Sequence, residues 1–206
     1  MESAIDFKSR FGIYGGSFDP PHYGHLALAE TARVQLHLDS VLFVPAGEPP
    51  HKRDRLLSPA EDRAAMTAAA IADNPAFMLS RVDLDRPGPH YTVDMLAQLR
   101  VQYPDTDTWF LLLGEDSLHD LPTWYNPQGI LEQAYLAVMP RLSKRADLAE
   151  LTAILPALAE KLTWLDIPPI NFSSTDLRRR VREGLPLRYL VPPAVETYIH
   201  IHGLYR

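Results

Sequence analysis

Residues 12–25 read Gly-Ile-Tyr-Gly-Gly-Ser-Phe-Asp-Pro-Pro-His-Tyr-Gly-His. The apolar run 11–14 leads into a glycine pair and a proline pair, and a helical pattern then opens at Gly24. This order predicts a strand, a sharp loop and the N-terminus of a helix. Such a junction binds anions, because glycines let the backbone approach a phosphate and the first helical N–H groups have no internal partner.

Two histidines stand at the predicted entrance of this helix. His22 and His25 are three residues apart, so the loop can aim both imidazoles at one ligand. Each ring can donate a hydrogen bond to a phosphate oxygen, and neither needs to act as a base. The alternatives are that the glycine pair is only a turn and that each histidine is a cap or a surface residue.

Alternating helices and strands are predicted along the rest of the chain. Apolar residues at helical spacing predict helices over 24–38, 59–72, 92–99 and 146–158, with Pro59 as a first helical residue and Pro156 as a break or a start. Short apolar runs predict further strands over 41–44, 77–80, 108–113, 135–139 and 162–165, and the tail is predicted to be helical. We therefore expect an α/β fold, a Rossmann-like doubly wound parallel sheet of about five to six strands with a helical C-terminal segment. Its ligand crevice should lie at the carboxyl ends of the strands.

Length and composition are those of an ordinary globular protein. The chain has 206 residues, of which 46% are hydrophobic and 22% charged, so we expect one domain with room for a small subdomain. It has no cysteine, which removes disulfides and thiolate metal sites. No apolar run of membrane-spanning length and no leader-like N-terminus occur, and these features predict a soluble cytoplasmic protein.

The net charge of −6 argues against general binding to nucleic acid or to an anionic membrane. Positive charge for an anionic ligand must then be concentrated locally. Two clusters offer it, Lys52 with Arg53 and Arg55, and residues 178–182. The sequence leaves a monomer and a homodimer open.

The run 15–25, Gly-Gly-Ser-Phe-Asp-Pro-Pro-His-Tyr-Gly-His, resembles the signature of the nucleotidylyltransferase superfamily, whose H/T-x-G-H element holds the phosphates of a nucleoside triphosphate. Residues 172–178, Phe-Ser-Ser-Thr-Asp-Leu-Arg, are similar to its I-S-S-T-x-x-R element, with Phe172 in place of the usual Ile. The alternative is that Ser173 and Asp176 form a variant capping box. The ATP-binding residues that the resemblance implies are Gly15, Gly16, Ser17, Phe18, His22, His25, Gly114, Asp116, Ser174, Thr175 and Arg178.

Three further segments resemble bacterial nicotinate mononucleotide adenylyltransferases: Pro-His-Lys at 50–52, Tyr-Thr-Val-Asp at 91–94 and Pro-Thr-Trp-Tyr at 122–125. The alternatives are a solvated charged loop and a tryptophan that merely covers the core. One departure from the family is Arg141-Leu142-Ser143, which lacks the glycine of the usual Arg-x-Gly. The implied substrate-binding residues are Asp19, Lys52, Thr92, Trp124 and Tyr125.

The resemblance spans nearly the whole chain, with the motifs in family order. It implies a single domain over 1–206, with 170–206 as a helical subdomain that contributes the S-S-T-x-x-R element. It also implies transfer of the adenylyl group of ATP to nicotinate mononucleotide, with Mg²⁺ accompanying the ATP and no dedicated metal site in the protein. His22, His25, Lys52 and Arg178 would be the catalytic residues, and Asp19 could orient a water of the metal ion. The alternatives are another phosphate acceptor and a non-catalytic nucleotide sensor on the same fold.

Overall fold

A computed structural model describes residues 9–47, 57–140, 146–168 and 172–206. Its centre is a six-stranded sheet in the order β3-β2-β1-β4-β5-β6, in which every neighbouring pair is parallel. The strands are β1 Ser9–Gly16, β2 Ser40–Pro45, β3 Phe77–Leu79, β4 Thr106–Gly114, β5 Tyr135–Met139 and β6 Leu162–Trp164. The predicted doubly wound α/β fold is confirmed, and its topological switch point lies between β1 and β4.

The helices alternate with these strands along the chain. They are α1 Tyr23–Gln35, α2 Ala60–Ile71, α3 Thr92–Gln102, α4 Glu115–Asp120, α5 Pro127–Gln133, α6 Leu148–Ile154, α7 Leu158–Lys161, α8 Ser174–Arg182 and α9 Pro193–Ile201, with a 3₁₀ turn, η2, at Leu121–Thr123. No helix in the described ranges is long and apolar enough to cross a membrane.

Both faces of the sheet are covered, and the strand side chains divide between two cores. Val41 and Phe43 of β2 belong to one apolar cluster, while Leu42 and Val44 belong to the other. Side chains alternate between faces along a strand, so a strand buried on both sides appears as a continuous apolar run. This burial explains why the predicted strands show no alternation of apolar and polar residues.

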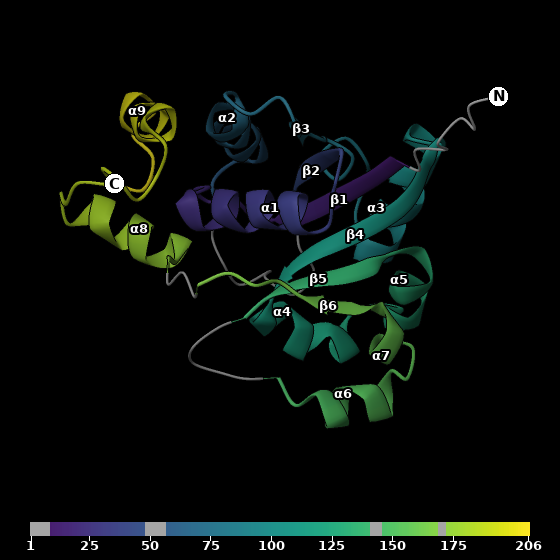
Figure 1. The fold of residues 1–206 in the computed structure, drawn as a ribbon. Coiled ribbons are helices and arrows are strands. Elements are labelled where there is room, and N and C mark those ends of the chain that lie inside the picture. Colours follow the sequence, from purple (N-terminus) through teal and green to yellow (C-terminus); the bar gives the residue numbers. More distant parts are fainter. Residues whose placement is uncertain (1–8, 48–56, 141–145, 169–171) are drawn as a thin grey trace.

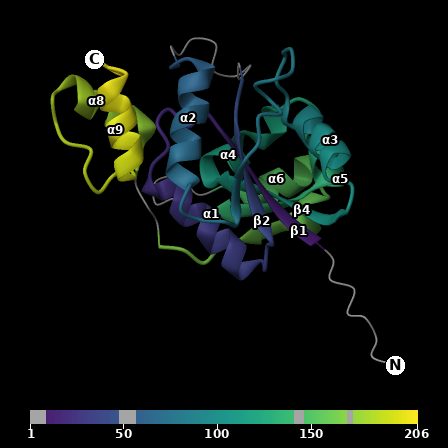
Figure 2. The same ribbon diagram turned by 90° about the horizontal axis from the view of Figure 1, so that it is seen from above.

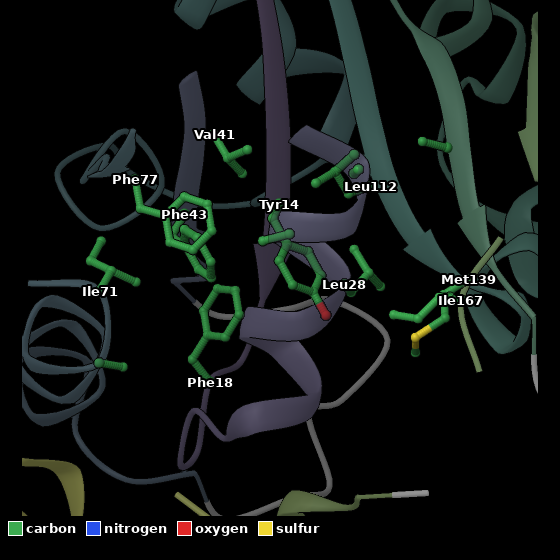
Figure 3. Close-up of a cluster of buried hydrophobic side chains, with 14 of the residues drawn as sticks. Tyr14, Phe18, Leu28, Val41, Phe43, Ile71, Phe77, Leu112, Met139 and Ile167 are labelled. Atoms are coloured by element: carbon green, nitrogen blue, oxygen red, sulfur yellow. The ribbon is translucent and has the colours of Figure 1, made fainter. Parts of the chain in front are cut away.

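Helices α1 and α2 cover one face, whereas α3, α4, α5, α6 and α7 supply residues to the core of the other face (Figure 1). Figure 3 shows the first core, in which Tyr14 and Phe18 lie beside Phe43 and Phe77. The ring of Phe18 is 5.4 Å from that of Tyr14 and 5.7 Å from that of Phe43. A cluster of aromatic rings thus fills the core next to the loop that follows β1.

The C-terminal helices join this first core. Figure 2 shows α9 beside α2, and Leu177 of α8 and Val195 and Ile199 of α9 are buried in the same cluster as Leu28. The backbone N–H of Tyr23 donates to the carbonyl of Leu190 at 3.2 Å. The C-terminal segment is therefore packed directly against the end of β1 and the beginning of α1.

Pro156 divides the predicted helix 146–158, which is one of the two roles predicted for it. Helix α6 ends at Ile154, and Pro156 lies in the turn before α7, where its ring cannot continue a helix. The predicted position of Pro59 was wrong, because Pro59 is the residue before α2 and has extended backbone.

Candidate active site

The loop after β1 keeps one backbone position open. An ideal Cβ built on Gly15 meets no atom within 4 Å, whereas one built on Gly16 would lie 3.1 Å from the ring of Phe18. Gly15 is exposed and lines a cavity, so the absence of its side chain leaves room for a ligand rather than for protein atoms.

The two histidines meet at the N-terminus of α1. Their rings are stacked, with centroids 3.6 Å apart and planes inclined by 19°. The backbone N–H of His22 donates to Nδ1 of His25 at 3.1 Å. A neutral imidazole that accepts at Nδ1 carries its proton on Nε2, so His25 is fixed as a donor at its outer nitrogen. The spacing of the two histidines predicts that both imidazoles point at one ligand, and the stacked arrangement is compatible with this prediction.

Phe18 packs with its ring against the ring of His25. Its backbone has a φ of 49°, its side chain is 1% exposed, and its ring packs edge-on against His25 at 5.1 Å. A side chain this deeply buried leaves only the backbone of Phe18 for contact with a nucleotide. Its aromatic ring holds His25 in place.

A cavity of about 480 Å³ opens at the carboxyl ends of β1, β2 and β4, where the topology predicts a crevice. Gly15, Gly16 and Ser17 form one side of it, while Thr92, Trp124 and Tyr125 form another. Segments that are more than 70 positions apart in sequence thus face one cavity, and six residues expected at the two substrates share its lining.

Aromatic rings and a helix terminus shape the far wall of this cavity. Tyr125 stacks on Tyr91 with centroids 4.3 Å apart, and Trp124 packs against the second core. Thr92 is the first residue of α3, whose N–H groups in the first turn have no intrahelical partner. The wall can therefore offer a flat apolar surface together with backbone donors.

A largely buried ion pair of Arg86 with Asp83 adjoins the cavity, and Asp83 is part of its lining. Arg86 donates to Asp83 at 2.8 Å and to the carbonyls of Pro89 and Tyr91 at 3.1 and 3.2 Å. Burial raises the pKa of Asp83, although Arg86 acts in the opposite direction. The pair thereby holds the segment that leads into α3. Neither residue was singled out from the sequence, in which both belong to an ordinary charged turn.

Helix α8 approaches the loop after β1 from the other side. Ser174 Oγ donates to the carbonyl of Pro20 at 3.0 Å, and Arg178 Nη1 donates to the carbonyl of Asp19 at 2.7 Å. Arg178 Nη2 also donates to Thr175 Oγ1 at 3.3 Å, which fixes the guanidinium plane. The predicted S-S-T-x-x-R element therefore meets the predicted H-x-G-H loop. The capping-box alternative was wrong, because Ser173 makes no side-chain cap hydrogen bond and Asp176 pairs with Arg179.

Asp19 lies between these two elements. Its side chain is 1% exposed; Oδ1 accepts from the hydroxyl of Tyr205 at 2.6 Å and Oδ2 from the N–H of Ser58 at 3.3 Å. Both oxygens thus have protein partners. Within the described ranges, no group of three or more histidine, aspartate or glutamate side chains could hold a metal ion.

Arg63 of α2 is a buried cation that the sequence analysis did not find. Its side chain donates to the carbonyls of Ser17 at 3.1 Å, Ala46 at 2.6 Å, Gly47 at 3.1 Å and Ser58 at 3.1 Å. One guanidinium thus joins the loop after β1 to the ends of the segment that carries Lys52. In the sequence, Arg63 is one charged residue in an alanine-rich helix, and its burial depends on carbonyls as far as 46 positions away.

The remaining expected residues lie elsewhere. Gly114 ends β4 and Asp116 is exposed in α4, both outside the described lining of the cavity. Glu115, between them, is buried and accepts the N–H of Ala146 at 2.8 Å. Lys52 and Arg141 lie outside the described residues.

A parallel sheet in this order, with a glycine loop and a helix N-terminus at the end of its first strand, is typical of nucleotide-binding α/β proteins. The profile of the cytidylyltransferase-like family matches residues 13–180. A probable nicotinate-nucleotide adenylyltransferase of Thermomicrobium roseum is 50% identical over 198 residues, which cover 96% of this chain and 92% of the relative. One of Thermus thermophilus is 45% identical over 197 residues, which cover 96% of this chain and the whole relative.

Solved structures agree at the level of the fold. Plasmodium falciparum nicotinic acid mononucleotide adenylyltransferase, complexed with NaAD, superimposes with a TM-score of 0.77 at 20% identity, over 96% of this chain and 97% of that one. The chain therefore belongs to the nicotinate-nucleotide adenylyltransferases of the cytidylyltransferase-like family.

Proposed function

We propose that the protein transfers the adenylyl group of ATP to nicotinate mononucleotide, giving nicotinate adenine dinucleotide and pyrophosphate, a step of NAD biosynthesis. The observation that carries this proposal is the position of the loop 15–25. Its glycine end lines the cavity with Trp124, and its middle, Asp19 and Pro20, accepts hydrogen bonds from Arg178 and Ser174 of α8. Two ligands bound on these two sides would bring their phosphates together over one loop.

The reaction needs no nucleophile from the protein. The 5′-phosphate oxygen of the acceptor attacks the α-phosphorus of ATP, the bond to the β-phosphate oxygen breaks in line, and pyrophosphate leaves with that electron pair. Catalysis then consists of positioning and of stabilising negative charge. We assign the second task to His22, His25 and Arg178, and also to Lys52.

His25 has the most defined part in this mechanism. Because its Nδ1 accepts the His22 N–H, its Nε2 presents a proton to the triphosphate. A donor fixed in advance costs no reorganisation when charge develops between the α- and β-phosphates. Magnesium would accompany ATP as part of the substrate, where it would neutralise phosphate charge and need few protein ligands.

The acceptor site would recognise a carboxylate through backbone groups. In the described lining of the cavity, the aspartates and the histidine are Asp83, Asp120 and His90, and there is no lysine or arginine. The nicotinate carboxylate would instead accept from N–H groups at the N-terminus of α3, near Thr92, and around Tyr125. Trp124 would stack on the pyridine ring.

Release of pyrophosphate from MgATP across a panel of phosphate acceptors tests this function. We expect nicotinate mononucleotide to give the highest kcat/KM, with nicotinamide mononucleotide, phosphopantetheine and cytidylyl-transfer substrates with CTP as comparisons. A preference for one of the others would reassign the acceptor. Nucleotide binding without turnover for any acceptor would contradict enzymatic function.

A further inference from the structure

Tyr205 reaches the loop after β1 from the segment that follows α9. Its hydroxyl donates to Asp19 Oδ1 at 2.6 Å across 186 positions of sequence, and its backbone has a φ of 66°. Left-handed backbone is uncommon for a tyrosine and persists only where the surroundings determine it. Here the surroundings are the first core, against which Tyr205 packs.

The partner of Tyr205 is the residue that orients Arg178. Arg178 Nη1 donates to the carbonyl of Asp19 at 2.7 Å and lies 3.8 Å from its Oδ2. A carboxylate that is 1% exposed needs donors to replace water. Without the tyrosine hydroxyl, Asp19 would have to shift toward another donor, and its carbonyl and Oδ2, which face Arg178, would shift with it.

We propose that Tyr205 is a positioning residue of the triphosphate site, acting on Arg178 through Asp19. This inference rests on the proposed function, because it assumes that Arg178 contacts the triphosphate. Burial raises the pKa of Tyr205 well above its usual range and Asp19 acts in the same direction, while Arg178 opposes them. The hydroxyl is therefore protonated at every working pH and remains a donor.

A second tyrosine supplies a matched control. Tyr198 of α9 donates to Asp62 Oδ1 of α2 at 2.9 Å, which is the same kind of hydrogen bond between the C-terminal segment and the core. Tyr205→Phe and Tyr198→Phe each remove one hydroxyl and keep the ring. Only the first of them removes a donor to Asp19.

Steady-state kinetics of both variants, well below their melting temperatures, test the proposal. We expect Tyr205→Phe to lower kcat/KM for MgATP by roughly tenfold, on the scale of a hydrogen bond to a charged group, and to leave the KM for nicotinate mononucleotide within about twofold. Tyr198→Phe should change neither value by more than about twofold. Equal effects of the two variants on kcat/KM for MgATP would overturn the proposal.

A double-mutant cycle tests the route through Arg178. In an Arg178→Lys background, Tyr205→Phe should cost less than about twofold, because the guanidinium that Asp19 orients is gone. An undiminished tenfold effect there would contradict this route. If the unmodified protein gave no turnover with nicotinate mononucleotide, the proposed function would fail separately, and MgATP dissociation constants of the same variants would still decide the role of Tyr205.

Discussion

The hydrogen bond from the His22 backbone to His25 Nδ1 leads to a prediction for His25 itself. His25→Ala removes a fixed donor, which is worth about 2.7 to 4 kcal/mol of transition-state stabilisation, so kcat at saturating MgATP should fall roughly 10²- to 10³-fold. His37→Asn is the control, since His37 is exposed after α1 with a φ of 51° that asparagine tolerates. A fall of less than about fivefold in His25→Ala would show that His25 has another role.

A side chain at Gly15 should interfere with the ligand and not with the packing of the protein. Gly15→Ala adds a methyl group that meets no protein atom within 4 Å, so the free energy of unfolding should stay equal or rise by about 0.4 to 1 kcal/mol. The same methyl group points into the space where we place the substrate phosphates. We therefore expect kcat/KM to fall at least about tenfold, because misplacement of reacting groups is costly.

Gly12→Ala is the matched substitution in the same strand. Its Cβ would lie 2.9 Å from Leu38 Cδ1 in the buried core, so it should destabilise the fold by about 1 to 3 kcal/mol. The activity of the folded fraction should remain unchanged. Thermal melts and kinetics on both alanine variants measure this contrast, and a destabilised but fully active Gly15→Ala would contradict the assignment.

Trp124 and the backbone donors near it should affect acceptor binding in different ways. A stacked pyridine gains about 0.5 to 1.5 kcal/mol from the aromatic face, whether it carries an acid or an amide. The carboxamide of nicotinamide has N–H groups, which cannot accept hydrogen bonds from the backbone N–H donors of the site. Each backbone donor left unpaired costs about 1 to 3 kcal/mol. Two such donors predict a preference of roughly 10²-fold or more for the acid.

Trp124→Ala should then weaken both acceptors by similar factors and leave the acid-to-amide ratio largely intact. The measurement is kcat/KM for the two mononucleotides on both proteins. Equal use of the two by the unmodified protein would exclude the backbone donors as the source of selectivity. A ratio that collapses only in the variant would assign the selectivity to Trp124.

At the scale of elements, two of the arginines of α8 have different surroundings. Arg178 is held by Asp19 and Thr175, whereas Arg179 forms exposed ion pairs with Asp176 and Glu183. A lysine cannot reproduce the planar fork that makes two directed contacts. Arg178→Lys should therefore lower kcat/KM for MgATP by about 10- to 100-fold without changing the KM for the acceptor.

Arg179→Lys supplies the comparison on the same helix. Water screens exposed pairs of this kind, so the melting temperature should shift little and kcat/KM should stay within about twofold. A similar loss of activity in both variants would mean that the helix as a whole, and not Arg178, determines the effect.

The elements themselves were largely predictable because their signals are local. The strand over 135–139 has the bounds that its apolar run predicts, and the helix predicted over 92–99 continues to Gln102. The sequence left open whether Pro156 breaks the helix over 146–158 or starts a new one, because tertiary packing decides between the two.

At the scale of the whole molecule, we predict that the reaction depends on magnesium. No cluster of three metal-ligating side chains occurs in the described ranges, so we expect the metal ion to arrive with the nucleotide. Chelation should abolish activity, and added magnesium should restore it, while the melting temperature without nucleotide stays unchanged. Stoichiometric zinc in chelator-treated protein, or turnover without any divalent ion, would contradict this expectation.

The loop motif could be predicted because its residues are neighbours in sequence, as His22 and His25 are. Arg63 and Tyr205 could not be predicted, since their partners lie up to 46 and 186 positions away. A buried arginine and a tyrosine in a tail have no periodicity or spacing that marks them. Only the folded chain shows that they hold the ends of the predicted loops.

The contact between Tyr205 and Asp19 also affects how the protein is made. The loop after β1 leaves the ribosome early, but α8, α9 and Tyr205 close around it only when nearly all of the remaining sequence has been translated. A nascent chain can complete β1 to β6 and the cavity beside Trp124 before this happens. We therefore expect the acceptor side to form before the triphosphate side, because only the latter needs the docked C-terminal segment.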